Sequence, residues 1–138
     1  MFHSFLSSKH NAFQINTALL LLRVAAGIWM AFHGYQKLTG FTTIEPQFME
    51  FLGLSKSVSL GLTIFSELLC SLLLVAGLFT RIALIPLIVT MLVAVFMAHG
   101  GDLFGEGEHA FLYLAIYLAL LISGPGKYSA DEWFYGNK

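Results

Sequence analysis

The chain has 138 residues, of which 57% are hydrophobic and 11% are charged, and its mean hydropathy is +0.78. Soluble domains average about 45–50% apolar residues, so this composition excludes an ordinary soluble domain and indicates a chain embedded in lipid. The formal net charge of −1, without any cluster of Lys and Arg, excludes a nucleic-acid-binding protein. The single cysteine, Cys70, excludes an intramolecular disulfide and a CxxC motif.

Four apolar segments come close to the length of about 20 residues that a helix needs to cross a bilayer. They are residues 17–38, 58–79, 82–100 and 108–124. Only Thr80 and Arg81 separate the second and third segments, so these helices are expected to form a tight antiparallel hairpin. We predict an all-α integral membrane protein: one domain over residues 1–138, folded as a four-transmembrane-helix bundle. A soluble bundle would need polar faces, and residues 82–98 carry no charge.

The distribution of Lys and Arg outside the spans predicts the orientation of the chain in its membrane. With four spans, both termini share one side with the turn at Arg81, and that side carries Lys9, Arg81, Lys127 and Lys138. The opposite side has Lys37 and Lys56, and its loop at residues 100–107 is acidic. The excess of Lys and Arg on the side of the termini predicts that the N- and C-termini are cytoplasmic.

The longest loop, near residues 39–57, joins the first two spans. Its apolar side chains predict a segment that lies in the membrane interface: Phe41, Phe48, Met49, Phe51 and Leu52. At the other end of the chain, Gly124-Pro125-Gly126 is expected to stop the fourth helix. The sequence Ser129-Ala130-Asp131-Glu132 then predicts a capping box that opens a short terminal helix.

Polar residues recur inside the spans, where an ionisable group costs at least about 2.5–3.5 kcal/mol and needs a partner, a cavity or a function. On the first helix they share one broad face with small residues: Arg23, Gly27, Met30, His33, Gly34 and Lys37. On the second helix a similar stripe contains Thr63, Glu67, Cys70 and Ser71. Arg23 is expected to approach Glu67 if the two helices pack together. That pair has two open interpretations, a structural salt bridge or a working proton or cofactor site.

A polar vestibule is predicted above Glu67, at the outer end of the spans. Its expected members are His33, Lys37, His99, Glu108 and His109, with Tyr113 on the face of His109. No local metal motif such as HExxH is present, so we predict no metal site. Haem held between His33 and His99 is less favoured than hydrogen-bonding or titrating histidines, because imidazole titrates near neutral pH.

Several motifs resemble those of the DoxX family. On the first helix these are Leu22-Arg23-Val24-Ala25-Ala26-Gly27 and Phe32-His33-Gly34-Tyr35-Gln36-Lys37-Leu38. Glu67, Ala76-Gly77-Leu78-Phe79-Thr80-Arg81, His99-Gly100 and Gly124-Pro125-Gly126-Lys127-Tyr128-Ser129 with Asp131 fit the same pattern, so the resemblance covers nearly the whole chain. It implies a four-helix protein of the bacterial inner membrane. The family takes its name from subunits linked to a thiosulfate:quinone oxidoreductase and to other membrane redox complexes.

Three functions are considered. The first is a redox-linked subunit that binds quinone, with Glu67, His33 and His99 as catalytic groups and with cofactor contacts from Arg23, Lys37, His109 and Tyr113. The second is an accessory subunit whose polar face serves a partner and whose Arg23–Glu67 contact is structural. The third is a small solute or proton transporter, disfavoured because Pro86 is the only proline inside a span. Small residues are also expected to allow a homo-oligomer, namely Gly27, Ala31, Gly61 and Ala94.

Overall fold

The computed structural model describes residues 2–136 of the chain, and Lys138 of the charge count lies outside them. All regular structure in the described part is helical, as predicted. In chain order the elements are α1 (Phe2–Phe5), α2 (Ala12–Thr39), α3 (Phe41–Ile44), the 3-10 turn η1 (Glu45–Gln47), α4 (Lys56–Ile64), the π segment η2 (Phe65–Cys70), α5 (Ser71–Ala76), α6 (Thr80–Val93), the π segment η3 (Ala94–Ala98), α7 (Glu108–Ser123) and α8 (Ala130–Tyr135).

Three continuous helices are long and apolar enough to cross a membrane: α2, the run α4–η2–α5 over Lys56–Ala76, and the run α6–η3 over Thr80–Ala98. They correspond to the first three predicted spans. The predicted fourth span corresponds to α7, whose 16 residues extend about 24 Å, less than the roughly 30 Å of a bilayer core. At the N-terminal end, α2 begins at Ala12 because Asn11 and Gln14 form a capping box that the sequence analysis missed.

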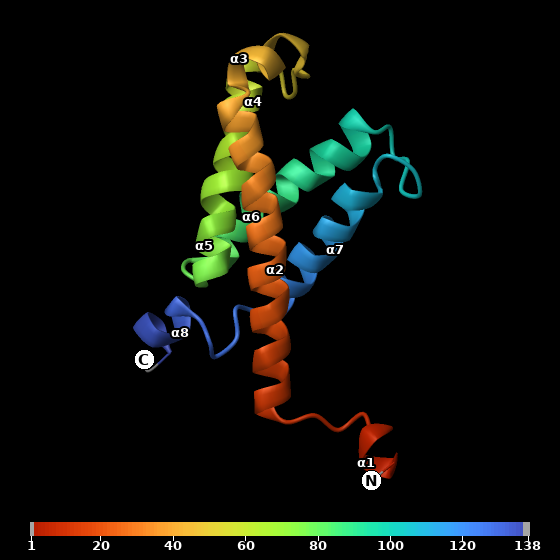
Figure 1. Ribbon diagram of the computed structural model, residues 1–138, viewed down its shortest axis with the longest axis vertical. Coiled ribbons are helices and arrows are strands. Elements are labelled where there is room, and N and C mark those ends of the chain that lie inside the picture. Colours follow the sequence, from red (N-terminus) through yellow and green to blue (C-terminus); the bar gives the residue numbers. More distant parts are fainter. Residues whose placement is uncertain (1, 137–138) are drawn as a thin grey trace.

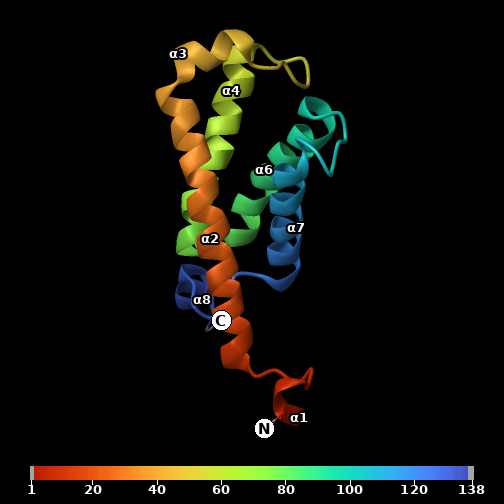
Figure 2. The same cartoon turned by 45° about the vertical axis from the view of Figure 1, so that its right-hand side comes forward.

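The helices are arranged as two hairpins that meet at one end of the molecule and separate toward the other (Figures 1 and 2). The first hairpin pairs α2 with η2 and α5, and the second pairs α6 with α7. They are joined where α5 turns into α6, and they splay apart at the end that carries α3. The side chains that close the joined part are fully buried: Leu74, Leu84, Leu87, Tyr117 and Leu120.

The turn between α5 and α6 confirms the predicted tight hairpin. Gly77 adopts a left-handed conformation with φ of 69°, and the N–H of Leu78 donates to the carbonyl of Leu73 at 3.0 Å, which closes the end of α5. Phe79 also has a positive φ, of 49°, and α6 begins at the next residue. The turn therefore consists of residues 77–79, and Thr80 and Arg81, which the sequence predicted as the turn, are instead the first residues of α6.

Two glycines let α2 approach the second helix closely. A Cβ atom at Gly27 would lie 2.5 Å from a methyl group of Val75, and one at Gly34 would lie 2.6 Å from the backbone nitrogen of Leu68. Small residues at such contacts are typical of membrane helices, whose association depends on close packing. The prediction that Gly27 and Ala31 serve an oligomer was wrong, because both are buried within this chain.

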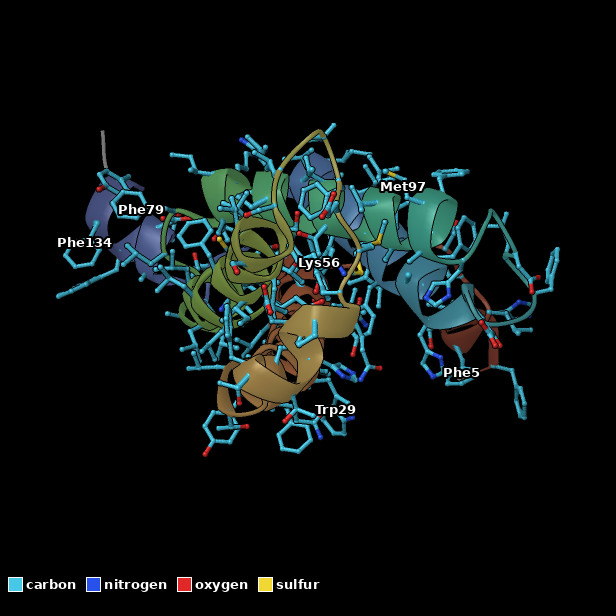
Figure 3. The ribbon with its side chains drawn as sticks, turned by 90° about the horizontal axis from the view of Figure 1, so that it is seen from above. Phe5, Trp29, Lys56, Phe79, Met97 and Phe134 are labelled. Atoms are coloured by element: carbon cyan, nitrogen blue, oxygen red, sulfur yellow. The ribbon has the colours of Figure 1, made fainter. Side chains whose placement is uncertain are left out.

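The outer surface of the bundle is strongly apolar. Seen from the splayed end, Trp29, Phe79 and Met97 point away from the bundle (Figure 3), and each is at least 46% exposed. A surface of this kind is stable against lipid tails but not against water. The exposed belt agrees with the helix lengths in identifying a membrane protein.

Candidate functional site

The site is organised around an ion pair between the two helices of the first hairpin. The Nζ of Lys37, near the end of α2, lies 2.6 Å from Oε2 of Glu67, which lies in η2. The Glu67 side chain is 7% exposed and the Lys37 side chain 26%, so the lysine is the more accessible member of the pair. Gly34 allows this contact, because it brings α2 against the backbone of Glu67 and Leu68.

The predicted pairing of Arg23 with Glu67 was wrong. Arg23 is buried at the joined end of the bundle, where its Nη1 donates to the carbonyl of Pro125 at 2.5 Å and its Nη2 to the carbonyl of Tyr128 at 2.7 Å. The sequence spacing permitted both arrangements, since Arg23 and Lys37 lie on the same broad face of α2. The loop after α7 folds back under the bundle and supplies the carbonyls that the guanidinium binds.

A cavity of about 210 Å³ opens beside the ion pair, between α4, η2, α6 and the loop after η1. Its polar wall consists of Lys37, Thr63, Glu67, Thr90 and His99. Its apolar wall consists of Phe48, Met49, Phe51, Val89, Val93, Ala94 and Ala98. The cavity thus lies at the splayed end, where the two hairpins separate.

Both π segments border this cavity. Glu67 lies within η2, and His99 directly follows η3. A π segment interrupts the regular i→i−4 hydrogen bonds, and such segments occur frequently at functional sites because they redirect side chains. Nothing in the hydrophobic pattern of the sequence distinguishes these turns from ordinary α-helix.

Residues of the loop that was predicted to lie in the membrane interface also form the roof of the cavity. Phe48, Met49 and Phe51 are partly buried against the site, whereas Leu52 is exposed. Hydrogen bonds fix the loop to the start of α4: the Nζ of Lys56 donates to the carbonyl of Pro46 at 2.9 Å, and Ser57 donates to Glu45 at 2.7 Å. Part of the apolar pattern of the loop is thus explained by contact with the cavity, and its position in the membrane interface stays a prediction.

Of the predicted vestibule, only Lys37 and His99 join Glu67 at the cavity. His33 is exposed on α2 and does not line the cavity. His109 and Tyr113 border a separate, mostly apolar depression between α2 and α7, together with Trp29. The haem arrangement with His33 and His99 therefore has no geometric support. In the described part of the chain no three His, Cys, Asp or Glu side chains are grouped as metal ligands.

His99 has a feature that sequence alone did not reveal. Its Nδ1 atom is buried and has no hydrogen-bond partner among the described residues, and Oε2 of Glu106 lies 3.9 Å from it. A buried ring nitrogen of this kind normally has a partner. The His99 ring also lines the cavity, so a group that enters the cavity would meet it.

Thr90 is a cavity residue that the sequence analysis missed. Its hydroxyl lies 2.9 Å from the hydroxyl of Ser66 and 2.8 Å from the carbonyl of Pro86, so it links α6 to η2 behind Glu67. The available signal was a hydroxyl in the middle of a helix whose other polar residues, Thr80 and Arg81, lie in its first turn. Pro86, one turn earlier, cannot donate its own hydrogen bond, which disturbs the helix at this point.

The joined end has a different construction. Asp131, in α8, accepts hydrogen bonds from the N–H groups of Phe79 and Thr80 at 2.7 and 2.8 Å, and so caps α6 from another element. Ser129 is the N-cap of α8, and its hydroxyl accepts a hydrogen bond from the N–H of Glu132 at 3.3 Å, which is one of the two bonds of the predicted capping box. We call Arg23, Gly77, Pro125, Tyr128 and Asp131 the clamp, because they tie the C-terminal segment to α2 and α6.

Comparison with known proteins agrees with this architecture. The DoxX family model matches residues 18–100, more than half of the chain, and this range contains Lys37, Glu67 and His99. Comparisons with curated proteins and with solved structures gave no match. The family match and the membrane-spanning helices together lead to one identification: the chain belongs to the DoxX family of membrane proteins.

Proposed function

We propose that the cavity beside Lys37 and Glu67 binds the head group of a membrane quinone, and that the chain serves as a redox-linked membrane subunit. The single observation that carries this proposal is the composition of the cavity. A partly buried ion pair and the imidazole of His99 lie on one wall, and apolar side chains lie on the other. An aromatic ring with polar oxygens at its edges is complementary to both walls.

The size of the cavity supports a ring of limited dimensions. Sites for drug-sized ligands commonly have volumes of about 300–1,000 Å³, and this cavity is about 210 Å³. That volume suits one substituted ring, with a long tail left outside in the lipid. The location is also suitable, because Val89 and Val93 of a membrane-spanning helix form one wall.

The residues have separate roles in this proposal. Lys37 and His99 supply hydrogen-bond donors for the ring oxygens, and Glu67 holds the ammonium group of Lys37 in place. A quinone supplies two-electron chemistry, in which reduction adds two electrons and two protons to give the quinol. The electrons come from an electron-donating partner subunit, and the groups of the polar wall exchange the protons. Arg23, His33 and His109 have no part in it, because the structure places them elsewhere.

The test is the quinone content of the protein purified in a mild detergent, measured by mass spectrometry of an organic extract. Wild type is expected to retain quinone, whereas Glu67→Gln and Lys37→Met are expected to lose it about tenfold or more, equivalent to about 1.4 kcal/mol. The matched control is Glu108→Gln, which changes an exposed glutamate outside the cavity. Equal retention by Glu67→Gln would overturn the proposal. Absence of quinone from wild type would favour an accessory subunit without its own ligand.

We also propose the topology: four crossings in the bacterial inner membrane, with both termini in the cytoplasm. The distribution of Lys and Arg supports this orientation. The test replaces Cys70 by Ala and introduces single cysteines at Lys127 and at Asp102, which flank α7. Labelling with a membrane-impermeant maleimide is expected only from the cytoplasmic side for Lys127→Cys, and only from the outside for Asp102→Cys. Labelling of both from one side would show that α7 does not cross.

A further inference from the structure

Two depressions on the surface of the joined end share part of their lining. One lies between the start of α6 and α8, and the other lies between α2, the start of α6 and the loop after α7. Each has a volume of about 380 Å³, and Arg81, Pro125 and Glu132 line both of them. The two depressions therefore adjoin, and we call them together the joined-end groove. The cavity beside Glu67 lies at the opposite, splayed end of the bundle.

The guanidinium of Arg81 is oriented by the end of α7, although the side chain is exposed. Its Nε donates to the carbonyl of Leu121 at 3.2 Å, and a Cβ atom at Gly124 would lie 3.2 Å from its Nη2. The guanidinium thus lies against the backbone of Gly124, where the absence of a side chain leaves room for it. Its terminal nitrogens, Nη1 and Nη2, have no hydrogen-bond partner among the described residues. A planar pair of free donors matches the geometry of a phosphate group.

The charged side chains of the groove balance one another. Two are cationic, Arg81 and Lys127, and two are anionic, Asp131 and Glu132. Asp131 is already occupied, because both of its carboxylate oxygens accept backbone N–H groups. In the described part of the chain Arg81, Lys127 and Glu132 form no ion pair within 4 Å, although all three line the groove. A ligand that carries one negative and one positive group is complementary to these charges.

The surroundings of the groove are suited to the surface of a bilayer. α8 lies beside the joined end (Figure 1), and its aromatic side chains are exposed, namely Trp133, Phe134 and Tyr135. Trp and Tyr are enriched where membrane meets water. Ile82 lines the groove, and Ile85 follows it on the same face of α6; both are more than half exposed. An acyl chain can therefore pack on α6 while its head group occupies the groove.

We propose that the joined-end groove binds a phospholipid whose head group carries a phosphate and a primary ammonium group, as in phosphatidylethanolamine. Arg81 and Lys127 bind the phosphate, Glu132 accepts hydrogen bonds from the ammonium group, and an acyl chain packs on Ile82. Basic pockets at the ends of membrane helices bind lipid head groups in other proteins. Phosphatidylglycerol has no ammonium group, and the quaternary ammonium of phosphatidylcholine has no N–H to donate, so both are poorer partners for Glu132.

The first experiment measures lipid binding to the full chain by native mass spectrometry in a mild detergent, after the copurified lipid has been removed. The probes are phosphatidylethanolamine, phosphatidylcholine and phosphatidylglycerol with the same acyl chains. Wild type is expected to bind phosphatidylethanolamine about threefold or more tightly than the other two lipids. Equal affinity for all three lipids, or a preference for phosphatidylglycerol, would overturn the proposal.

Two substitutions test the two parts of the head group separately. Arg81→Gln is expected to weaken the binding of all three lipids about threefold or more, because each of them carries a phosphate. Glu132→Gln is expected to weaken only phosphatidylethanolamine and so to remove the preference. The matched controls are Lys9→Gln and Glu50→Gln, which change exposed charges outside the groove. Binding like that of wild type in Arg81→Gln, or an unchanged preference in Glu132→Gln, would contradict the proposal.

The second experiment compares thermal unfolding with and without added phosphatidylethanolamine, which also shows that each variant is folded. Without lipid, Arg81→Gln is expected to unfold close to wild type, because Arg81 makes a single hydrogen bond within the described chain. Added lipid is expected to raise the unfolding temperature of wild type by several degrees and to leave that of Arg81→Gln unchanged. An equal rise in both proteins would show that the lipid binds elsewhere. A rise of the same size with inorganic phosphate alone would show an anion site and overturn the assignment to a lipid.

Neither measurement involves quinone, and the groove and the cavity lie at opposite ends of the bundle. The lipid proposal and the quinone proposal can therefore fail separately. The quinone content of Arg81→Gln, measured in the same preparations, is expected to equal that of wild type. A loss of both lipid and quinone from Arg81→Gln, together with a lowered unfolding temperature in the absence of lipid, would show a general structural role for Arg81 and overturn the lipid site.

Discussion

The two ends of this bundle contain buried charges that are satisfied in different ways. At the clamp, Arg23 is 1% exposed and donates to two backbone carbonyls of the C-terminal loop. At the cavity, Lys37 and Glu67 pair with each other beside open space, and His99 keeps an unpartnered nitrogen. The helices are joined at the first end and splayed at the second.

This difference indicates that the clamp contributes to stability and that the cavity serves ligand binding. A cation that is enclosed and bonded to fixed carbonyls has no capacity left for a ligand, so the clamp is a structural element. A pair that shares its surroundings with a cavity can exchange one partner for a ligand at lower cost. Substitutions at the clamp should therefore mainly reduce stability, and substitutions at the cavity should mainly reduce ligand binding.

The largest loss of stability is expected for Arg23→Met. This change removes two hydrogen bonds that a charged group donates, and it leaves two backbone carbonyls without that donor. The expected cost is about 3 kcal/mol or more in the free energy of unfolding. The measurement is the unfolding temperature and the fraction of monodisperse protein in detergent. The control is Arg81→Met, because Arg81 is exposed and makes one longer bond, to the carbonyl of Leu121 at 3.2 Å. Equal losses from both variants would contradict a special role for the clamp.

Gly34→Ala tests the approach of α2 to the cavity helix. The added methyl group would lie 2.6 Å from the nitrogen of Leu68, so the helices must separate, at a cost of about 1–3 kcal/mol. Gly61→Ala is the matched control, since a Cβ there meets no atom within 4 Å. That control is expected to gain about 0.5–1 kcal/mol from helix propensity. Unfolding curves that place Gly34→Ala at or above wild type would show that the close contact is absent.

The substitution Lys37→Met distinguishes the role of the cavity from that of the clamp most clearly. It removes one hydrogen bond to Glu67, at a cost of about 1–2 kcal/mol, because the lysine is partly exposed and water can replace it. Its effect on retained quinone should exceed its effect on stability, which is the reverse of the result for Arg23→Met. Measuring both properties on both variants checks this reversal. A larger loss of stability for Lys37→Met than for Arg23→Met would contradict it.

The smallest effect is expected for Asp131→Ala. The substitution removes the cap that α8 provides for the first residues of α6, and losing a cap of this type costs about 1 kcal/mol. Asp102→Ala changes an exposed aspartate in the loop before α7 and serves as the control. Differential scanning fluorimetry should resolve the two variants. Identical melting temperatures would mean that the N–H groups of Phe79 and Thr80 do not depend on Asp131.

The sequence alone identified the class of this protein and most of its helices. Long apolar segments with few charges determine a membrane-embedded helical chain, because the hydrocarbon core admits little else. Gly124 and the N-cap Ser129 located helix ends correctly, since those signals act between residues close in the chain. Glu67 was found for a similar reason: a carboxylate in the middle of a span is costly wherever it lies.

Only the tertiary structure decided which charged groups meet. Arg23 and Lys37 lie on the same face of α2, and helical periodicity cannot tell which of them reaches Glu67. The choice depends on a loop about a hundred residues later, whose carbonyls bind Arg23, and on the close approach that Gly34 allows. The cavity likewise depends on π turns and on the position of a loop. These features arise from packing between distant segments, which local sequence patterns do not encode.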